Sequence, residues 1–236
     1  MTTQPPQGVP SRVLNVFVSH KATHKKKARK LKDALHYFGV ESFLAHEDIE
    51  PTRQWEDEII NALQRADVLI ALLTPDFRES DWTDQEIGAA VGRGIPVIPV
   101  SLGLTPYGFA ARFQTIDLTR VDMEHAAEQI VTGLLRRESR DVRGLITNSF
   151  VVGMHRVDSF SSGEQLAKIV PLLRDLSDDQ VAAIVQQYNA NRQVNGSGHF
   201  DGLADHLTRM TDRAFKLIPK RWESEIRERD PIFDLS

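Results

Sequence analysis

The chain has 236 residues, of which 41% are hydrophobic and 26% are charged, and its formal net charge is −4. These values are ordinary for a soluble globular protein, and the acidic balance gives no bulk attraction to nucleic acid or to an anionic membrane. Because the chain has no cysteine, disulfides, cysteine-ligated zinc and thiol catalysis are excluded. No apolar run approaches the ~20 residues needed to cross a bilayer, and residues 1–10 lack the apolar segment of a signal peptide. We therefore expect a cytoplasmic protein.

The first half of the chain alternates short apolar runs with amphipathic segments. Between the runs, apolar residues recur at helical spacing, and Gly39 and Gly94 stand where two helices should end. This alternation predicts an α/β fold, a doubly wound parallel five-stranded sheet with helices on both faces. The expected strands lie within residues 13–19, 40–44, 68–73, 95–100 and 113–118, and a further helix is expected at 123–137.

The second half is predicted to form a small all-α domain. Capping-box patterns that begin at Ser161 and Ser177 indicate two helix starts, and Pro171 should kink the first of these helices. A third helix should begin near Leu203, after a polar loop at 189–199. The resulting division of the chain is a flexible tail at 1–11, an α/β domain at 12–138, a connector at 139–160 with an unassigned apolar run, a helical domain at 161–218 and a tail at 219–236.

The carboxyl ends of parallel strands meet at one edge of a sheet, where such folds bind their ligands. Ser19, His20 and Lys21 follow the first expected strand, and Asp48 follows the second. The helix after the third strand should begin at 80–83, which places Trp82 and Glu86 on one helical face because they are four residues apart. The pattern puts this face about 100° away from a core face formed by Ile87, Ala90 and Val91. The sequence thus predicts that one carboxylate and one tryptophan share the ligand edge.

Several other kinds of site are not supported by the sequence. No Walker A motif and no GxGxxG follows the first strand, and no GxSxG elbow is present. The histidines lack metal-site spacing such as HExxH, and Asn191, Asn195 and Asp201 do not match an EF-hand loop. We therefore expect no bound metal.

Six basic residues are crowded between Lys25 and Lys32. A phosphate- or nucleic-acid-binding helix is one interpretation. The other is the solvated face of an amphipathic helix, which we favour because no aromatic residues interleave and the whole chain is acidic.

Five stretches, in order, resemble the Toll/interleukin-1 receptor (TIR) domain family over roughly residues 12–138. Asn15 stands where the family commonly has Asp, and Thr52 where it commonly has Gly. The stretches are 15–20 (first box), 47–51 followed by Trp55 (the BB loop and second helix), 67–73 (third strand), 80–86 (catalytic helix) and 94–100 (fourth strand).

This resemblance implies a flavodoxin-like fold and an activity that cleaves NAD+ to nicotinamide and a linear or cyclic ADP-ribose. NAD+ would be the substrate and no cofactor is expected. Self-association through the TIR domain and a role in bacterial anti-phage defence are also implied. By the same resemblance the catalytic residue is Glu86, and the substrate-binding residues are Trp82, Phe17, Ser19, His20, Lys21 and Asp48.

Two alternatives remain open at this stage. A non-enzymatic TIR adaptor would assemble with other TIR domains and would not need Glu86. A nucleotide sensor or nucleic-acid binder would instead use the basic segment Lys25–Lys32. The sequence does not choose a role for the helical domain among sensor, oligomerisation device and partner platform.

Overall fold

The computed structural model describes residues 9–44, 55–80, 82–119, 122–211, 213–215 and 217. Its five strands form one sheet with the order β2-β1-β3-β4-β5, and every neighbouring pair is parallel. The predicted doubly wound sheet is therefore confirmed. The strands are β1 (Asn15–Ser19), β2 (Glu41–Leu44), β3 (Val68–Leu73), β4 (Val97–Ser101) and β5 (Ile116–Asp117).

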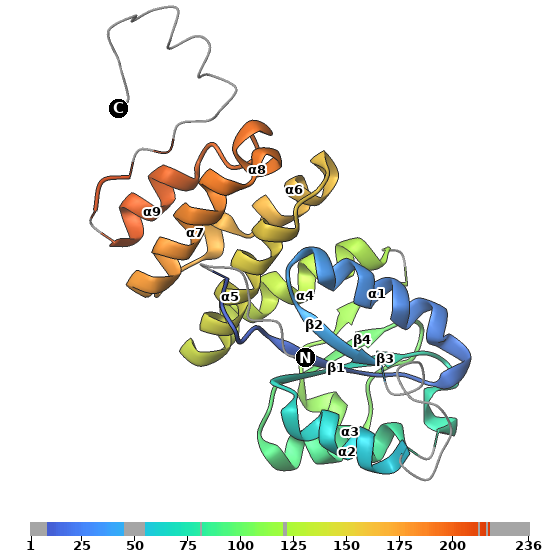
Figure 1. Ribbon diagram of the computed structural model, residues 1–236. Coiled ribbons are helices and arrows are strands. Elements are labelled where there is room, and N and C mark those ends of the chain that lie inside the picture. Colours follow the sequence, from blue (N-terminus) through green and yellow to red (C-terminus); the bar gives the residue numbers. More distant parts are fainter. Residues whose placement is uncertain are drawn as a thin grey trace, which may run out of the picture.

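Helices cover both faces of the sheet (Figure 1). On one face lie α1 (Lys25–Tyr37) and α4 (Met123–Arg137), and on the other lie α2 (Trp55–Arg65) and α3 (Thr83–Arg93). Short 3-10 turns, η1 (Ala22–His24), η2 (Phe77–Glu79) and η3 (Gly108–Arg112), follow β1, β3 and β4. Three loops after strands thus contain local helical structure at the edge where the ligand site was expected.

The central strand β3 explains why the sheet is covered on both sides. All six of its residues are buried, as expected for a parallel strand between two helical layers. Val68, Ile70 and Leu72 pack into the core that includes α1 and α4, whereas Leu69, Ala71 and Leu73 pack into the core that includes α2 and α3. The period of two along the strand therefore assigns alternate side chains to the two cores.

The C-terminal half is helical, as predicted. It contains α5 (Arg140–Arg156), α6 (Phe160–Ala167), the 3-10 turn η4 (Val170–Leu172), α7 (Asp178–Ala190), α8 (Arg192–Gly196) and α9 (Leu203–Thr211). The apolar run 149–154 is buried within α5, which contacts α1 and α4 on one side and α7 on the other. One hydrophobic cluster runs from the α1–α4 face of the sheet into the helical region. The domain boundaries given above remain predictions.

Local structure in the helical region departs from the sequence pattern at three points. The capping box at Ser177 is confirmed, but the first one joins Ser159 to Ser162 and not Ser161 to Glu164. Pro171 does not kink a continuing helix, because α6 ends at Ala167 and the proline lies in η4, where its missing N–H is tolerated in a first turn.

The third departure is α8, which lies inside the expected polar loop at 189–199. The Asn191 side chain accepts a hydrogen bond from the Gln193 N–H at 2.9 Å. Its Nδ2 donates to the carbonyl oxygens of Met154 at 2.8 Å and Val157 at 2.9 Å. The end of α5 therefore positions the residue that caps α8.

Several predictions fall outside the described residues. They concern Asp48 and the BB loop around it, most of the tail at 1–11, and the tail at 219–236. Among the helices of the described residues, none combines the length and apolar character required to cross a membrane.

Candidate functional site

The clearest polar contact at the carboxyl edge of the sheet joins Ser19 and Glu86. Ser19 is the last residue of β1, and Glu86 lies in the first turns of α3. The Ser19 Oγ donates a hydrogen bond to Glu86 Oε2 at 2.5 Å, although the residues are 67 positions apart. Both are buried, with exposed fractions of 0% and 2%. The fold thus brings together two residues that the sequence analysis had assigned to this edge.

Burial dominates the electrostatics of Glu86. It raises the pKa of this carboxyl from 4.5 to about 8, while the hydrogen bond from Ser19 opposes the shift. Within the described part of the chain, Glu86 Oε1 has no hydrogen-bond partner. The protonated acid is therefore the favoured form at neutral pH in this conformation.

The expectation that Glu86 lies away from the core face of its helix is wrong. Glu86, Ile87 and Ala90 are all buried. The reason is tertiary, because the first turns of α3 pack over the end of β1, and a position that would be solvated on an isolated helix is covered there.

The other proposed substrate-binding residues lie around this pair in different environments. Trp82 is the half-buried N-cap residue of α3, and its carbonyl accepts the Glu86 N–H at 2.9 Å. His20 is fully buried, with its Nδ1 3.1 Å from the Val18 carbonyl oxygen. Phe17 is buried in the core between the sheet and α2–α3, and its ring stacks on Phe43 at 5.5 Å.

Lys21 belongs to an ion-pair cluster that the sequence analysis missed. Its Nζ lies 2.5 Å from Glu79 Oε2 and 3.2 Å from Asp76 Oδ2. Asp76 also accepts from Thr74 Oγ1 at 2.8 Å and Thr23 Oγ1 at 3.1 Å, and its Oδ1 lies 2.8 Å from His24 Nε2. These bonds, with that from Thr74 as the largest cause, hold the pKa of Asp76 well below its usual range.

This cluster ties the loop after β1 to the loop after β3. Thr83 Oγ1, in the first turn of α3, donates to the Phe77 carbonyl at 3.1 Å, so the same loop is also joined to the helix that carries Glu86. The sequence signal for Asp76 was only that of an ordinary turn residue, because most of its partners lie more than 50 positions away.

A second contact holds α3 to the connection after β4. The Tyr107 hydroxyl donates to Asp84 Oδ1 at 2.7 Å, and the Arg78 guanidinium lies 4.0 Å from the centre of the Tyr107 ring. Partial burial, followed by the contact with Asp84, raises the pKa of Tyr107. The first turn of α3 is thus braced from a third loop.

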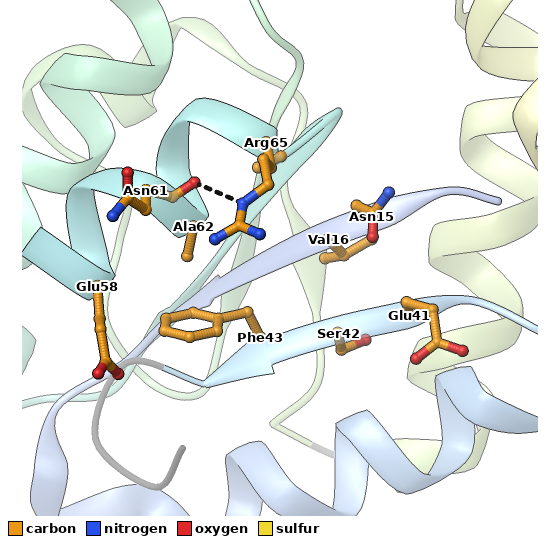
Figure 2. Close-up of a pocket in the computed structure, with 10 residues that line it drawn as sticks. Asn15, Val16, Glu41, Ser42, Phe43, Glu58, Asn61, Ala62 and Arg65 are labelled. Carbon is orange, nitrogen blue, oxygen red and sulfur yellow. Dashed lines mark hydrogen bonds between the residues drawn. The ribbon is translucent and has the colours of Figure 1, made fainter. Parts of the chain in front are cut away.

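A separate groove of about 400 Å³ lies between the edge strand β2 and α2 (Figure 2). Figure 2 shows the Phe43 ring below Ala62, and Arg65 Nε donates to the Asn61 carbonyl at 3.2 Å. Glu86 and Ser19 do not line this groove. The candidate active site is therefore the surroundings of the buried Ser19–Glu86 pair and not this groove.

No metal site is apparent in the part of the chain that the structure describes, where no group of three or more His, Cys, Asp or Glu side chains is placed to hold an ion. The expectation that no cofactor is needed stays a prediction.

Two comparisons with known proteins agree with this geometry. The family profile described as TIR domain matches residues 16–131, a segment that runs from β1 into α4 and contains Ser19 and Glu86. A probable 2′ cyclic ADP-D-ribose synthase of Brachypodium distachyon is 27% identical over 93 residues, which are 39% of this chain and 42% of that protein. The chain therefore matches less than half the length of this relative. With the five-stranded parallel sheet and the order of its elements, these findings show that residues 16–131 of this chain are a TIR domain.

Proposed function

We propose that this TIR domain cleaves the bond between nicotinamide and ribose in NAD+. The observation that carries the proposal is the buried Ser19–Glu86 pair, which joins the end of β1 to the helix that follows β3. The strand order reverses between β1 and β3, and doubly wound sheets bind ligands at that point. A relative whose name describes a probable cyclic ADP-D-ribose synthase supports NAD+ as the substrate class.

The chemistry requires one well-placed carboxylate. The nicotinamide ring of NAD+ is cationic, so when the glycosidic C–N bond breaks, the bonding electrons neutralise the leaving group and no general acid is needed. Positive charge develops on the ribose, as in other glycosyl transfers, and the Glu86 carboxylate would stabilise it. Water then attacks the ribose and loses a proton to give linear ADP-ribose, or a nucleophile of the same molecule gives a cyclic product.

The raised pKa of Glu86 fits this role if substrate binding releases the proton. A cationic ring within a few ångströms favours the ionised carboxylate, and the Ser19 hydroxyl stabilises that form further. Because Glu86 is only 2% exposed, the groups that cover it must move to admit the ribose. Trp82 would then offer a flat face to one of the two rings of the substrate, with His20, Phe17 and Asp48 completing the proposed site.

The direct test is to incubate the purified protein with NAD+ and measure free nicotinamide by chromatography, together with linear and cyclic ADP-ribose. The alternative is a non-enzymatic TIR adaptor, which would need no access of a substrate to the buried Ser19–Glu86 pair. An adaptor would release no nicotinamide at any protein concentration. A role in defence signalling rests on the family resemblance alone.

The first prediction concerns pH. If Glu86 must be ionised, kcat/KM for NAD+ should rise with pH, reach half its maximum near pH 8 and level off above it, because burial raises the pKa of the free-enzyme carboxyl to about 8. The inflection in kcat should lie at lower pH, because bound substrate carries a positive charge close to the carboxylate. Rates measured from about pH 5.5 to about pH 9, each corrected with a blank without enzyme, test this. A kcat/KM that does not change over this range would contradict the role of Glu86.

The second prediction concerns assembly. We propose that self-association promotes activity, because Ser19 and Glu86 are buried in the single chain and contact with a second copy would rearrange the groups that cover them. Nicotinamide release per mole of protein should therefore rise with protein concentration, in parallel with molecular mass measured by light scattering. Constant specific activity from a protein that stays monomeric throughout would contradict self-association and leave the chemistry of Glu86 untouched.

A further inference from the structure

Lys21 is held at the rim of the site by two carboxylates whose environments differ. Asp76 is anchored, because hydroxyl and imidazole groups from Thr74, Thr23 and His24 approach it in addition to the lysine. Its side chain is 29% exposed. Glu79 is the last residue of η2, its side chain is 71% exposed, and its contact is with the Lys21 ammonium at 2.5 Å.

These differences decide which carboxylate can release the lysine. Moving Asp76 would disrupt bonds to two loops at once. Moving Glu79 would break one ion pair of a largely exposed side chain, and such pairs contribute little because water replaces them readily. Lys21, by contrast, is 20% exposed and would stay beside Asp76 after Glu79 had left. An anion that reaches the rim therefore competes with Glu79 and not with Asp76.

We propose that Glu79 is a latch that occupies Lys21 in the free protein and yields it to the diphosphate of the substrate. This inference rests on the proposed function for the identity of the ligand, whose diphosphate carries two negative charges where Glu79 carries one. The latch sets the affinity for the anionic part of the substrate and does not touch the reacting bond. Glu79 is thus a residue that limits substrate binding and is not a catalytic residue.

The test is Glu79→Gln, which keeps the shape of the side chain and removes its charge. The KM for NAD+ should fall about two- to fivefold, the range expected for an exposed charge interaction, while kcat stays unchanged because the contact is the same in ground and transition states. A defect in folding cannot produce this result, since it would lower activity and not improve binding.

A second measurement does not depend on turnover. Isothermal titration with inorganic pyrophosphate at low ionic strength should show tighter binding to Glu79→Gln than to the unchanged protein. The gain should disappear in the double variant Lys21→Met with Glu79→Gln, because the latch acts only through the lysine. Glu41→Gln is the matched control, since Glu41 is a half-exposed glutamate that pairs with Arg156 at 2.7 Å at the opposite edge of the sheet.

The outcomes separate the latch from the enzymatic proposal. Pyrophosphate binding that tightens in Glu79→Gln, is lost with Lys21→Met and is unaltered in Glu41→Gln supports the latch even if NAD+ is not cleaved. Unchanged or weaker pyrophosphate binding in Glu79→Gln overturns it, as does a gain that survives the loss of Lys21. Absence of nicotinamide release by the unchanged protein would count against the proposed function alone.

Discussion

Glu86→Gln is expected to lower nicotinamide release by roughly a hundred- to a thousandfold, the usual effect of removing one preorganised electrostatic contact from a transition state. Glutamine keeps the size of the side chain and a hydrogen bond with Ser19, so the lost property is the negative charge. The effect should fall on kcat, because positive charge on the ribose is greatest in the transition state. Chromatographic assays of nicotinamide at saturating NAD+ measure it.

Asp84→Asn provides a matched control for this variant. Asp84 is an exposed carboxylate two residues earlier in α3, and asparagine keeps the Oδ1 acceptor that Tyr107 contacts, so the same charge is removed from the same helix end while that bond and the Ser19–Glu86 pair are kept. Its kcat should stay within about threefold of the unchanged protein, as screening of exposed charges predicts. Equal turnover in Glu86→Gln and the unchanged protein would exclude Glu86 as the essential carboxylate.

The stability of Glu86→Gln gives an independent check on the state of the carboxyl. The pKa of Glu86 is about 8 in the folded chain against 4.5 for an ordinary glutamate, so the folded protein binds more protons than the unfolded one between these values. The contribution of the neutral Glu86 carboxyl to the stability of the unchanged protein is therefore complete below pH 4.5 and is lost as the pH rises toward about 8. Glutamine has no proton to lose, so the free energy of unfolding of the variant, relative to that of the unchanged protein, should be higher at about pH 8 than at about pH 5. Urea unfolding should show this difference as on the order of 2–4 kcal/mol. A difference that does not change with pH would show that the carboxyl is not held neutral.

Gly39→Ala should be the most destabilising of the small substitutions in the α/β part of the chain. Gly39 follows the end of α1 with a φ of +71°, and an added Cβ would lie 1.9 Å from the Ser149 carbonyl oxygen and 2.7 Å from the Gly153 nitrogen of α5. Both obstacles are backbone atoms, so no side-chain rotation relieves the clash. The free energy of unfolding should fall by about 2–5 kcal/mol, the sum of left-handed backbone strain and overpacking. This is a large fraction of the ~5–15 kcal/mol that stabilises a typical domain.

Gly94→Ala separates these two causes. Gly94 ends α3 with a φ of +70°, and nothing lies within 4 Å of the position its Cβ would take. Urea unfolding should show a loss of only about 1 kcal/mol, because the backbone strain remains and the clash does not. If both variants lost the same stability, the close approach of α5 to the end of α1 would not be part of the folded structure.

Features that depend on local pattern could be predicted from the sequence. The six apolar residues of β3 indicated a strand buried on both faces, Gly94 ends α3 in the left-handed conformation, and the capping box at Ser177 begins α7. The parallel sheet then followed from the alternation of such segments, and with it the placement of Ser19 and Glu86 at one edge. The strand, the helix end and the cap are each set within about a dozen residues, where helical and strand periods and capping preferences operate.

Only the tertiary structure decided the environment of those residues. The burial of Glu86 and its raised pKa arise because α3 packs over the end of β1. The spacing of apolar residues along a helix does not indicate such a contact with a distant strand. The Asp76 cluster joins two loops that are separate in sequence. Helix α5 packs against helices on two sides, so its apolar residues are not confined to one face. Side-chain type and spacing determine which helices and strands form. Contacts between distant elements determine how far a side chain such as Glu86 is removed from water and whether it carries a charge, and the proposed chemistry depends on both properties.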